Sequence, residues 1–317
     1  MSGAGVLARI GPEEPGTLLL GHHDTVWPAG TLAEIPFRIE GDRITGPGCF
    51  DMKAGLAIAL ATLEALAGLE DPPPVTLFSV PDEEIGSDGS RARTVEIAKR
   101  HERVLVLEPS KDGAVKIARK GTGLFHLTFR GRAAHAGLAP HDGASALAEL
   151  ARAVPAIAAI EDGERGTTVT PTVASAGTTT NVVPELATLS VDARTWDADE
   201  SRRVENAIRT LRAQDGRVTI QVEGGFDRLP LVPTPESERI YAKAREIAQA
   251  LGRELESARV GGGSDGNLTA AAGVPTLDGL GPRGGGAHAR DEHVIASDIP
   301  FRAALVTSLA LVQEDDE

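Results

Sequence analysis

Short hydrophobic runs alternate with helical patterns in the first third of the chain. The runs are residues 17–20, 75–80 and 104–107. Each run has the length of a buried strand. Between them, apolar residues recur at helical spacing over residues 52–66, and residues 90–100 have the composition of a polar helix. Strands that alternate with helices in this way pair in parallel. The pattern therefore predicts an α/β fold with a mostly parallel sheet flanked by helices.

The middle of the chain has a different pattern. Residues 123–129 alternate between apolar and polar positions, as in a strand with one buried face. Further strands are predicted at residues 168–176, 187–191 and 218–222, and helices at residues 144–160 and 200–212. Alternating strands of this kind are typical of an antiparallel sheet. The segment is therefore expected to be an α+β layer of its own.

The first pattern then returns towards the C-terminus. Helices are predicted at residues 236–251 and 297–312, with a strand at residues 274–277. We therefore expect two domains. Residues 1–120 and 226–317 form one α/β domain, and residues 121–225 form a module inserted into it.

The charge balance excludes two classes of partner. The 317 residues include 32 Lys or Arg and 46 Asp or Glu, which gives a formal net charge of −14. A chain this acidic is unsuited to nonspecific binding of nucleic acid or of anionic membranes.

The single cysteine, Cys49, excludes an internal disulfide. No apolar run has the length of a membrane span and the N-terminus has no signal-peptide pattern, so we expect a cytoplasmic protein.

Residue types that bind metals follow the predicted strands. They are His22, Glu83, Glu84 and Glu108 at strand ends, Asp51 at the start of the first helix, and His288 after the last strand. The carboxyl ends of parallel strands meet at one edge of a sheet, so these groups are expected to converge. Acids and imidazoles gathered in one crevice need a compensating cation. Mixed imidazole and carboxylate ligands suit zinc, and a bridging carboxylate would hold two ions about 3.5–4 Å apart.

Simpler interpretations stay open for each of these residues taken singly. A lone histidine is most often a surface residue, and an acidic pair such as Glu83 and Glu84 is usually a solvated turn. The loop at Gly261–Gly266 is rich in glycine, but no Lys-Ser or Lys-Thr follows it, which argues against a phosphate-binding loop. That loop leaves open a small-molecule binding module. We expect Cys49 to be a small buried thiol.

Seven sequence strings occur in order over nearly the whole chain. They are GHHDTV, GPGCFDMKAG, VPDEEIGSDGSR, LEPS, GRAAHAGLAP, NVVP and GGGAHARDEH. Together they resemble the dinuclear zinc aminoacylase and carboxypeptidase family, which includes glutamate carboxypeptidase, acetylornithine deacetylase and succinyl-diaminopimelate desuccinylase. The strings GGGSDGNL and LDGLGP are most similar to the glutamate carboxypeptidase branch. The resemblance implies a zinc exopeptidase-like catalytic domain with an inserted dimerisation and lid domain.

The resemblance also implies a role for individual residues of the α/β domain. The implied metal ligands are His22, Asp51, Glu84, Glu108 and His288. Asp51 would bridge two ions, with His22 and Glu108 on one of them. The implied ions are two Zn²⁺, with Co²⁺ or Mn²⁺ as alternatives.

Further roles are implied for residues beside the metal ligands and in the inserted module. Glu83 would be the general base, and Asp24 would accept the second imidazole N–H of His22. His135 resembles a histidine that reaches into the partner subunit's active site. Asn181 and Arg194 resemble residues that hold the carboxylate of the substrate. For His135 and Arg194, surface or lid-helix contacts remain the alternative.

These implications lead to one expected function and two alternatives. The expected protein is a zinc-dependent amidohydrolase or metallopeptidase that releases an amino acid with a free carboxylate, with C-terminal glutamate favoured. Its substrate would be an N-acyl amino acid or a short peptide, and it would form a homodimer through the inserted domain. The first alternative is a deacylase for acetyl or succinyl groups. The second is a catalytically silent metal-binding dimer, because the family usually has a longer segment before the position of His22.

Overall fold

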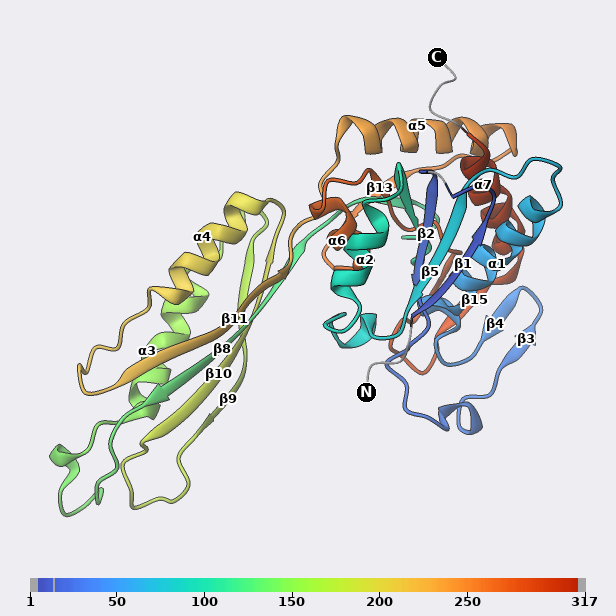
Figure 1. The fold of residues 1–317 in the computed structure, drawn as a ribbon. Coiled ribbons are helices and arrows are strands. Elements are labelled where there is room, and N and C mark those ends of the chain that lie inside the picture. The colour runs from blue at the N-terminus through green and yellow to red at the C-terminus, as the bar shows by residue number, and fades with distance from the viewer. Residues whose placement is uncertain (1–4, 14, 313–317) are drawn as a thin grey trace. The chain divides into compact units, whose positions relative to one another are not determined.

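The computed structural model of this chain describes residues 5–13 and 15–312, which divide into two compact units. The first unit is Met1–Arg119 with Leu231–Glu317, and the second unit is Lys120–Pro230. Figure 1 shows the elements of each unit. The second unit extends beyond the residue 225 expected from the sequence, because its last strand continues to pair as far as Arg228.

A five-stranded sheet forms the centre of the first unit, in the order β1-β5-β2-β6-β13. The strands are β1 (Val6–Ile10), β2 (Thr17–His22), β5 (Val75–Val80), β6 (Arg103–Val106) and β13 (Thr276–Leu277). All neighbours are parallel except β1, which pairs antiparallel with the edge of β5. Every residue of β2, β5 and β6 is buried, as expected for strands covered on both faces.

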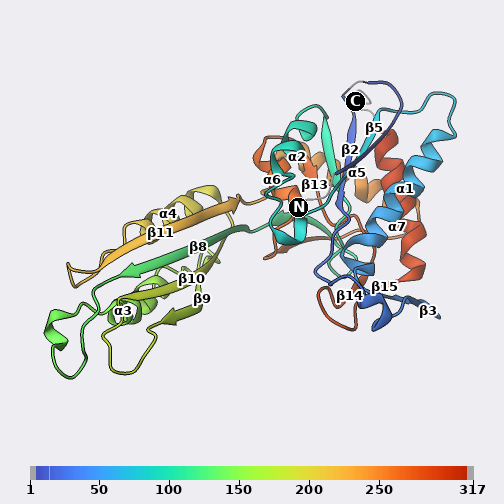
Figure 2. The same ribbon diagram turned by 60° about the horizontal axis from the view of Figure 1, so that its bottom comes forward.

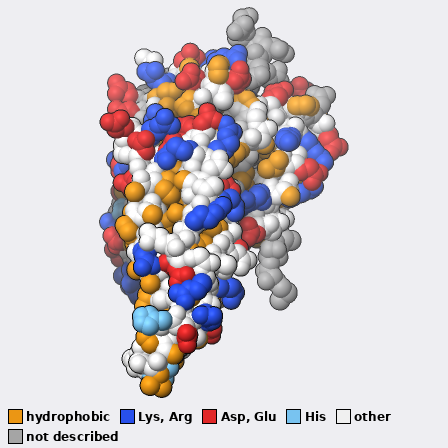
Figure 3. Space-filling view, turned by 90° about the vertical axis from the view of Figure 1, so that its left-hand side faces the viewer, with side chains coloured by type: hydrophobic (Ala, Val, Ile, Leu, Met, Phe, Trp, Pro, Cys, Tyr) orange, Lys and Arg blue, Asp and Glu red, His pale blue; other side chains and the backbone are white. Residues whose placement is uncertain are grey.

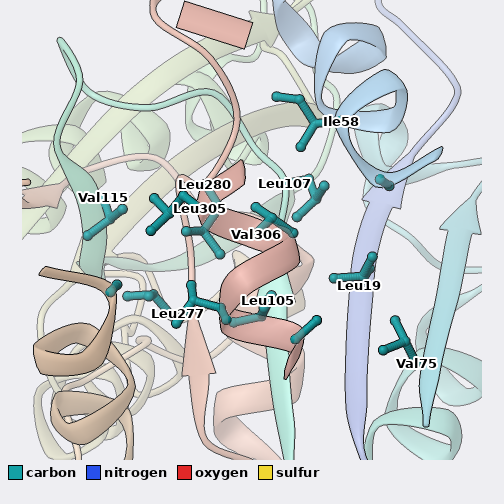
Figure 4. Packing of buried hydrophobic residues seen from close by; sticks show 14 of the residues in the cluster. Leu19, Ile58, Val75, Leu105, Leu107, Val115, Leu277, Leu280, Leu305 and Val306 are labelled. Atoms are coloured by element: carbon teal, nitrogen blue, oxygen red, sulfur yellow. The ribbon is translucent and has the colours of Figure 1, made fainter. Parts of the chain in front are cut away.

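Helices cover both faces of this sheet (Figure 1). They are α1 (Ala54–Ala67), α2 (Arg91–Ala98), α5 (Pro235–Ala250), α6 (Asp265–Ala271) and α7 (Ile299–Leu311). Because successive strand residues point to opposite faces, Leu19 joins the core beneath α1 and α7, whereas Leu18 and Leu20 pack with Ile97 of α2. Figure 4 shows Leu305 and Val306 of α7 above the strands in the larger core.

Two small sheets complete the first unit. The order β14-β15-β4-β3 joins four short strands, and β12 pairs with β7. Their bounds are β3 (Arg38–Glu40), β4 (Arg43–Thr45), β7 (Val115–Arg119), β12 (Ser257–Val260), β14 (Gly284–Gly285) and β15 (His293–Ile295). Single helical turns lie at Thr31–Ala33 and Ala296–Asp298 in this unit, and at Pro140–Asp142 in the second unit. Two helices start at side-chain caps, Thr234 before α5 and Ser264 before α6.

The second unit is an antiparallel sheet with two helices on one of its faces, as Figure 2 shows. In the order β11-β8-β10-β9, the strands are β8 (Gly121–Arg130), β9 (Thr168–Ala176), β10 (Leu186–Thr195) and β11 (Thr219–Arg228). The helices are α3 (Ala146–Ala158) and α4 (Ala198–Arg209). Phe125, Leu127 and Phe129 of β8 are buried against them, whereas His126 and Arg130 are exposed on the other face.

The predicted fold class is confirmed: the first unit has a mainly parallel sheet, and the second is a separate α+β layer. The strand β1 was missed, because its five residues are mostly exposed and too short to carry a clear pattern. Most of the small strands are shorter still, and β14 has only two residues, both of them glycine.

Charged groups of both signs are interspersed over the face seen in Figure 3. Among the side chains coloured there, acidic and basic groups alternate with hydrophobic ones rather than forming one basic patch. Of the helices in the described residues, none combines the length and the apolarity needed to cross a membrane.

A buried carboxylate stabilises the helical layer of the second unit. Glu200, in the first turn of α4, is fully buried and accepts hydrogen bonds from Arg203, from Arg165 at 2.9 Å and from the hydroxyl of Thr167 at 2.9 Å. The hydrogen bond from Arg203 is the main cause that lowers the pKa of Glu200 to about 2. The ionised form is therefore strongly favoured in the folded protein.

We expect Glu200→Gln to lower the free energy of unfolding by about 2 kcal/mol at pH 7, because a buried carboxylate with charged partners is lost. Since folding lowers the pKa of Glu200, its contribution is present above the usual pKa of 4.5 and is lost as the pH falls towards about 2. Urea unfolding at several pH values measures the difference. The exposed pair Asp199–Arg202 on the same helix provides the control: Asp199→Asn should change stability by less than about 0.5 kcal/mol. A Glu200→Gln variant as stable as wild type at pH 7 would contradict this account.

Candidate metal centre

Parallel strands deliver three acidic or imidazole segments to one edge of the sheet in the first unit. His22 is the last residue of β2, and Glu108 follows the end of β6 by two residues. The helical turn Glu83–Ile85 follows β5. Because β5, β2 and β6 are parallel neighbours, their carboxyl ends lie side by side.

Asp51 reaches the same edge from a distorted turn. The sequence predicts that Asp51 opens a helix over residues 52–66, but α1 begins later, at Ala54. Residues Cys49–Lys53 form a separate turn, in which Asp51 has non-helical angles (φ −113°, ψ 94°). The Asp51–Met52 peptide bond is cis. The turn leaves the Asp51 carboxylate pointing at both histidines.

The two carboxylate oxygens of Asp51 face different partners. Oδ1 lies 3.2 Å from Nε2 of His22, and that nitrogen is 3.4 Å from Oε1 of Glu108. Oδ2 lies 3.4 Å from Nε2 of His288, and this second nitrogen is 3.1 Å from Oε2 of Glu84. The structure therefore brings all five predicted ligands together as two histidine–glutamate pairs, with Asp51 between them.

This donor set fits divalent metal ions. In a tetrahedral zinc shell with bonds of about 2.0–2.1 Å, neighbouring ligand atoms are about 3.3 Å apart. The separations in both pairs match that spacing. In addition, Oε1 of Glu84 is buried and has no hydrogen-bond partner among the described residues. Ligand atoms of His22, Asp51 and Glu84 all lie within 4.8 Å of one another.

The cluster favours positive charge. Burial opposes a charged imidazole, but hydrogen bonds to Asp24, Asp51 and Glu108 outweigh it and raise the pKa of His22 well above its usual 6.5. Burial first, and then the negative charge of Asp51, raise the pKa of Glu84 above its usual value. The shift of His22 follows from the three carboxylates that surround its imidazole.

Asp24 joins two of the ligand segments. Its carboxylate accepts the backbone N–H of Glu84 at 3.0 Å and that of Glu83 at 3.3 Å. Nδ1 of His22 lies 3.4 Å from the Asp24 carboxylate and 3.1 Å from the Asp24 backbone carbonyl, which is the nearer acceptor. Asp24 thus orients both the imidazole and the turn that carries the acidic pair.

Glu83 and Cys49 lie close to the ligands without taking part in the two pairs. Glu83 is half-buried, next to the ligand candidate Glu84 on the same turn. Burial, with the charge of Glu292 next, raises the pKa of the Cys49 thiol to about 11. Cys49 is therefore a buried protonated thiol and no nucleophile.

A buried cationic group that was not predicted from the sequence lies behind Glu108. Arg119, at the end of β7, is 3% exposed and donates to both carboxylate oxygens of Asp278, at 2.7 and 3.0 Å. Its Nη2 lies 3.7 Å from Oε2 of Glu108. Lys116 adds a second cation, whose pKa is lowered to about 8 by burial and by Arg119. These cations balance the oxygen of Glu108 that faces away from His22.

His135 and Asn181 lie close together in the second unit. The backbone N–H of Ala136 donates to the carbonyl of Asn181 at 2.9 Å. Nδ1 of the exposed His135 accepts the N–H groups of Gly137 and Leu138, both at 3.1 Å. A nitrogen that accepts in this way places the ring proton on Nε2, which is left as a donor.

Arg194 lies on β10 of the second unit and has a partner there. Its Nε and Nη2 donate to the carboxylate of Asp192, at 2.9 and 2.8 Å. The predicted roles of His135, Asn181 and Arg194 in substrate binding stay predictions.

The chain is similar over most of its length to known peptidases and deacylases. The sequence model of peptidase family M20/M25/M40 matches residues 18–312. Carboxypeptidase G2 of Pseudomonas sp. (strain RS-16) is 34% identical over 308 residues, covering 93% of this chain and 73% of that protein. Succinyl-diaminopimelate desuccinylase of Verminephrobacter eiseniae (strain EF01-2) is 28% identical over 313 residues, covering 89% of this chain and 75% of that protein. The crystal structure of aminopeptidase PepT from Bacillus cereus has the same fold, with a TM-score of 0.77 at 22% identity over 96% of this chain and 83% of that one.

Proposed function

The chain belongs to peptidase family M20/M25/M40, and from this premise we propose that it is a two-metal amidohydrolase that releases an amino acid with a free carboxylate. Membership confirms the family resemblance of the sequence motifs. It also establishes the coarser function: the chain is a metal-dependent hydrolase of the peptidase and amidohydrolase class.

The observation that carries the two-metal proposal is the position of Asp51. Each of its oxygens faces a separate histidine–glutamate pair, His22 with Glu108 and His288 with Glu84. A single ion would need only one of these pairs. The mixture of imidazole and carboxylate favours zinc over magnesium or calcium, which prefer oxygen ligands. Cobalt and manganese are the alternatives that metal analysis distinguishes.

Divalent ions held by these five side chains would supply Lewis-acid stabilisation of the charge that develops on the scissile carbonyl, and would make a nearby water more acidic. Glu83 lies beside the ligand Glu84 and is the proposed general base: its carboxylate takes a proton from the attacking water and returns it to the leaving nitrogen. The Nε2–H of His135 is the proposed donor to the developing oxyanion.

For the substrate we propose an N-acyl amino acid or short peptide with C-terminal glutamate. The support is the similarity to carboxypeptidase G2 and the paired guanidinium of Arg194. That guanidinium is held through Nε and Nη2 by Asp192, so its Nη1 remains for a substrate carboxylate. The similarity to a succinyl-diaminopimelate desuccinylase supports an N-acyl deacylase as the second candidate.

Metal and base are tested together. Chelation should abolish amide hydrolysis and zinc should restore it, with about two ions per chain by elemental analysis.

Glu83→Gln should lower kcat by about 10²–10⁴-fold while the protein still binds two ions, because only proton transfer is lost. Glu13→Gln, at an exposed surface pair, provides the control and should keep full activity. A Glu83→Gln enzyme with wild-type kcat would remove Glu83 from the mechanism, and two bound ions with no turnover on any amide would favour the silent dimer.

The substrate class is tested by a panel of amides. We expect peptides and N-acyl amino acids that end in glutamate to have the highest kcat/KM, by about tenfold or more over their alanine analogues. The analogues lack the substrate's side-chain carboxylate, and with it a charge-assisted contact. Arg194→Lys should raise KM more than it lowers kcat. If N-succinyl or N-acetyl compounds are preferred whatever the amino acid, the hypothesis of an N-acyl deacylase replaces that of a carboxypeptidase.

We also propose a homodimer formed through the second unit, in which His135 serves the partner's site. Mixing His135→Ala and Glu83→Gln chains, each nearly inactive alone, should then restore roughly one quarter of wild-type activity after subunit exchange. Half of the dimers are mixed, and each has one complete site. Activity that does not return, although sedimentation shows mixed dimers, would place His135 in its own chain's chemistry or outside it.

A further inference from the structure

A buried carboxylate lies directly behind the turn that carries Asp51. Glu292 is 2% exposed and follows His288 by four residues. Its Oε1 accepts the backbone N–H of Phe50 at 2.9 Å and of Asp51 at 3.0 Å. Its Oε2 accepts the backbone N–H of Gly48 at 2.8 Å and the indole N–H of Trp27 at 2.9 Å. All four donors converge on one side chain.

These hydrogen bonds hold a turn that has no regular structure of its own. Asp51 has non-helical backbone angles, so its N–H and that of Phe50 are not satisfied by a regular helix. Gly48, at the start of the turn, has φ 70°, in the left-handed region. The carboxylate therefore replaces the hydrogen bonds that a regular element would supply, and it fixes where the Asp51 side chain begins.

Glu292 is also fixed to the loop that carries His288. Its backbone N–H donates to the carbonyl of Ala289 at 3.1 Å, and the N–H of Ala289 donates to Gly286 at 2.8 Å. The next residue, His293, pairs with Gly285 across β15 and β14. One residue thus connects the backbone of the Asp51 turn to the backbone of the His288 loop.

We infer that Glu292 is a positioning residue that sets the spacing between Asp51 and His288 and so controls the binding of the second metal ion. This inference rests on the proposed two-metal centre. We call the ion between His22 and Glu108 the first ion and the ion between His288 and Glu84 the second. The first ion can draw Asp51 towards itself, but the second ion needs the other Asp51 oxygen and His288 at the same time. Loss of the connection therefore weakens the second ion more than the first.

A carboxylate is required at this position because all of its partners are donors. Glutamine has nearly the same shape, but its NH₂ group would face one pair of N–H groups and leave them without an acceptor. Glu292→Gln is thus a small change in volume and a large change in the connection. Outer-sphere contacts of this kind typically alter metal affinity by about 10–100-fold.

Trp27 gives the connection a spectroscopic signal. The chain has two tryptophans, Trp27 and Trp196, and Trp196 lies in the second unit. In a Trp196→Phe background, Trp27 is the single indole and donates directly to Glu292. Metal binding at Asp51 should change Trp27 emission in that parent protein, and Glu292→Gln should remove most of the change.

The experiment titrates zinc into the metal-free parent and its Glu292→Gln variant, by calorimetry and by Trp27 fluorescence. We expect two equivalents in the parent. In the variant, the second equivalent should bind about 10–100-fold more weakly, and the first should change much less. Equal affinities for both equivalents in parent and variant would overturn the inference. A parent that binds no zinc would instead overturn the proposed function.

A matched control separates positioning from general loss of stability. Glu149 in the second unit is likewise buried, 3% exposed, and accepts the backbone N–H groups of Gln214 at 2.8 Å and Asp215 at 3.1 Å. Glu149→Gln should lower the melting temperature without changing either zinc affinity. An equal loss of second-ion affinity in Glu149→Gln would show that stability alone is responsible.

Two milder variants decide the question if Glu292→Gln does not fold. Glu292→Asp keeps the charge but withdraws it from the turn by one methylene, and should weaken the second equivalent by calorimetry. Trp27→Phe removes the indole donor and part of the ring but leaves the Glu292 carboxylate in place, and should weaken the same equivalent by a smaller factor. Unchanged second-ion affinity in a folded Glu292→Asp protein would refute the positioning role.

Discussion

The first unit is organised around one electrostatic constraint: a carboxylate shared between two histidine–glutamate pairs. Three carboxylates, those of Asp51, Glu84 and Glu108, lie within 3.1–3.4 Å of the nitrogens of two imidazoles at the edge of a buried sheet. Such a cluster persists only when cations or protons balance it. Arg119 and Lys116 behind Glu108, and the raised pKa of His22, are three forms of the same compensation.

The parallel sheet provides the place for this cluster. Buried strands β5, β2 and β6 run side by side, so segments distant in sequence end at one edge. Family membership, the mainly parallel fold and this edge together support a metal-dependent hydrolase. Within the second unit, His135 Nδ1 accepts two backbone N–H groups and Arg194 donates to Asp192.

Much of this architecture could be predicted from periodicity. The strand at residues 75–80 and the one at residues 168–176 have the predicted bounds, because a fully buried run and a flanked polar-apolar segment are strong local signals. The metal ligands at strand ends could be predicted because each acidic residue or histidine closely follows such an apolar run. Arg119 and Glu292 carry no local signal: their partners Asp278 and Asp51 are 159 and 241 residues away, and only the folded chain brings them together.

The chain leaves the first unit at Arg119 and re-enters it at Leu231. The backbones of these two residues exchange a pair of hydrogen bonds, at 3.0 and 3.1 Å. An antiparallel pair closed in this way is the geometry that a tight turn can bridge. The second unit is thus an insertion between two residues whose backbones already pair. A short hairpin loop in its place would leave the path of the first unit's backbone continuous.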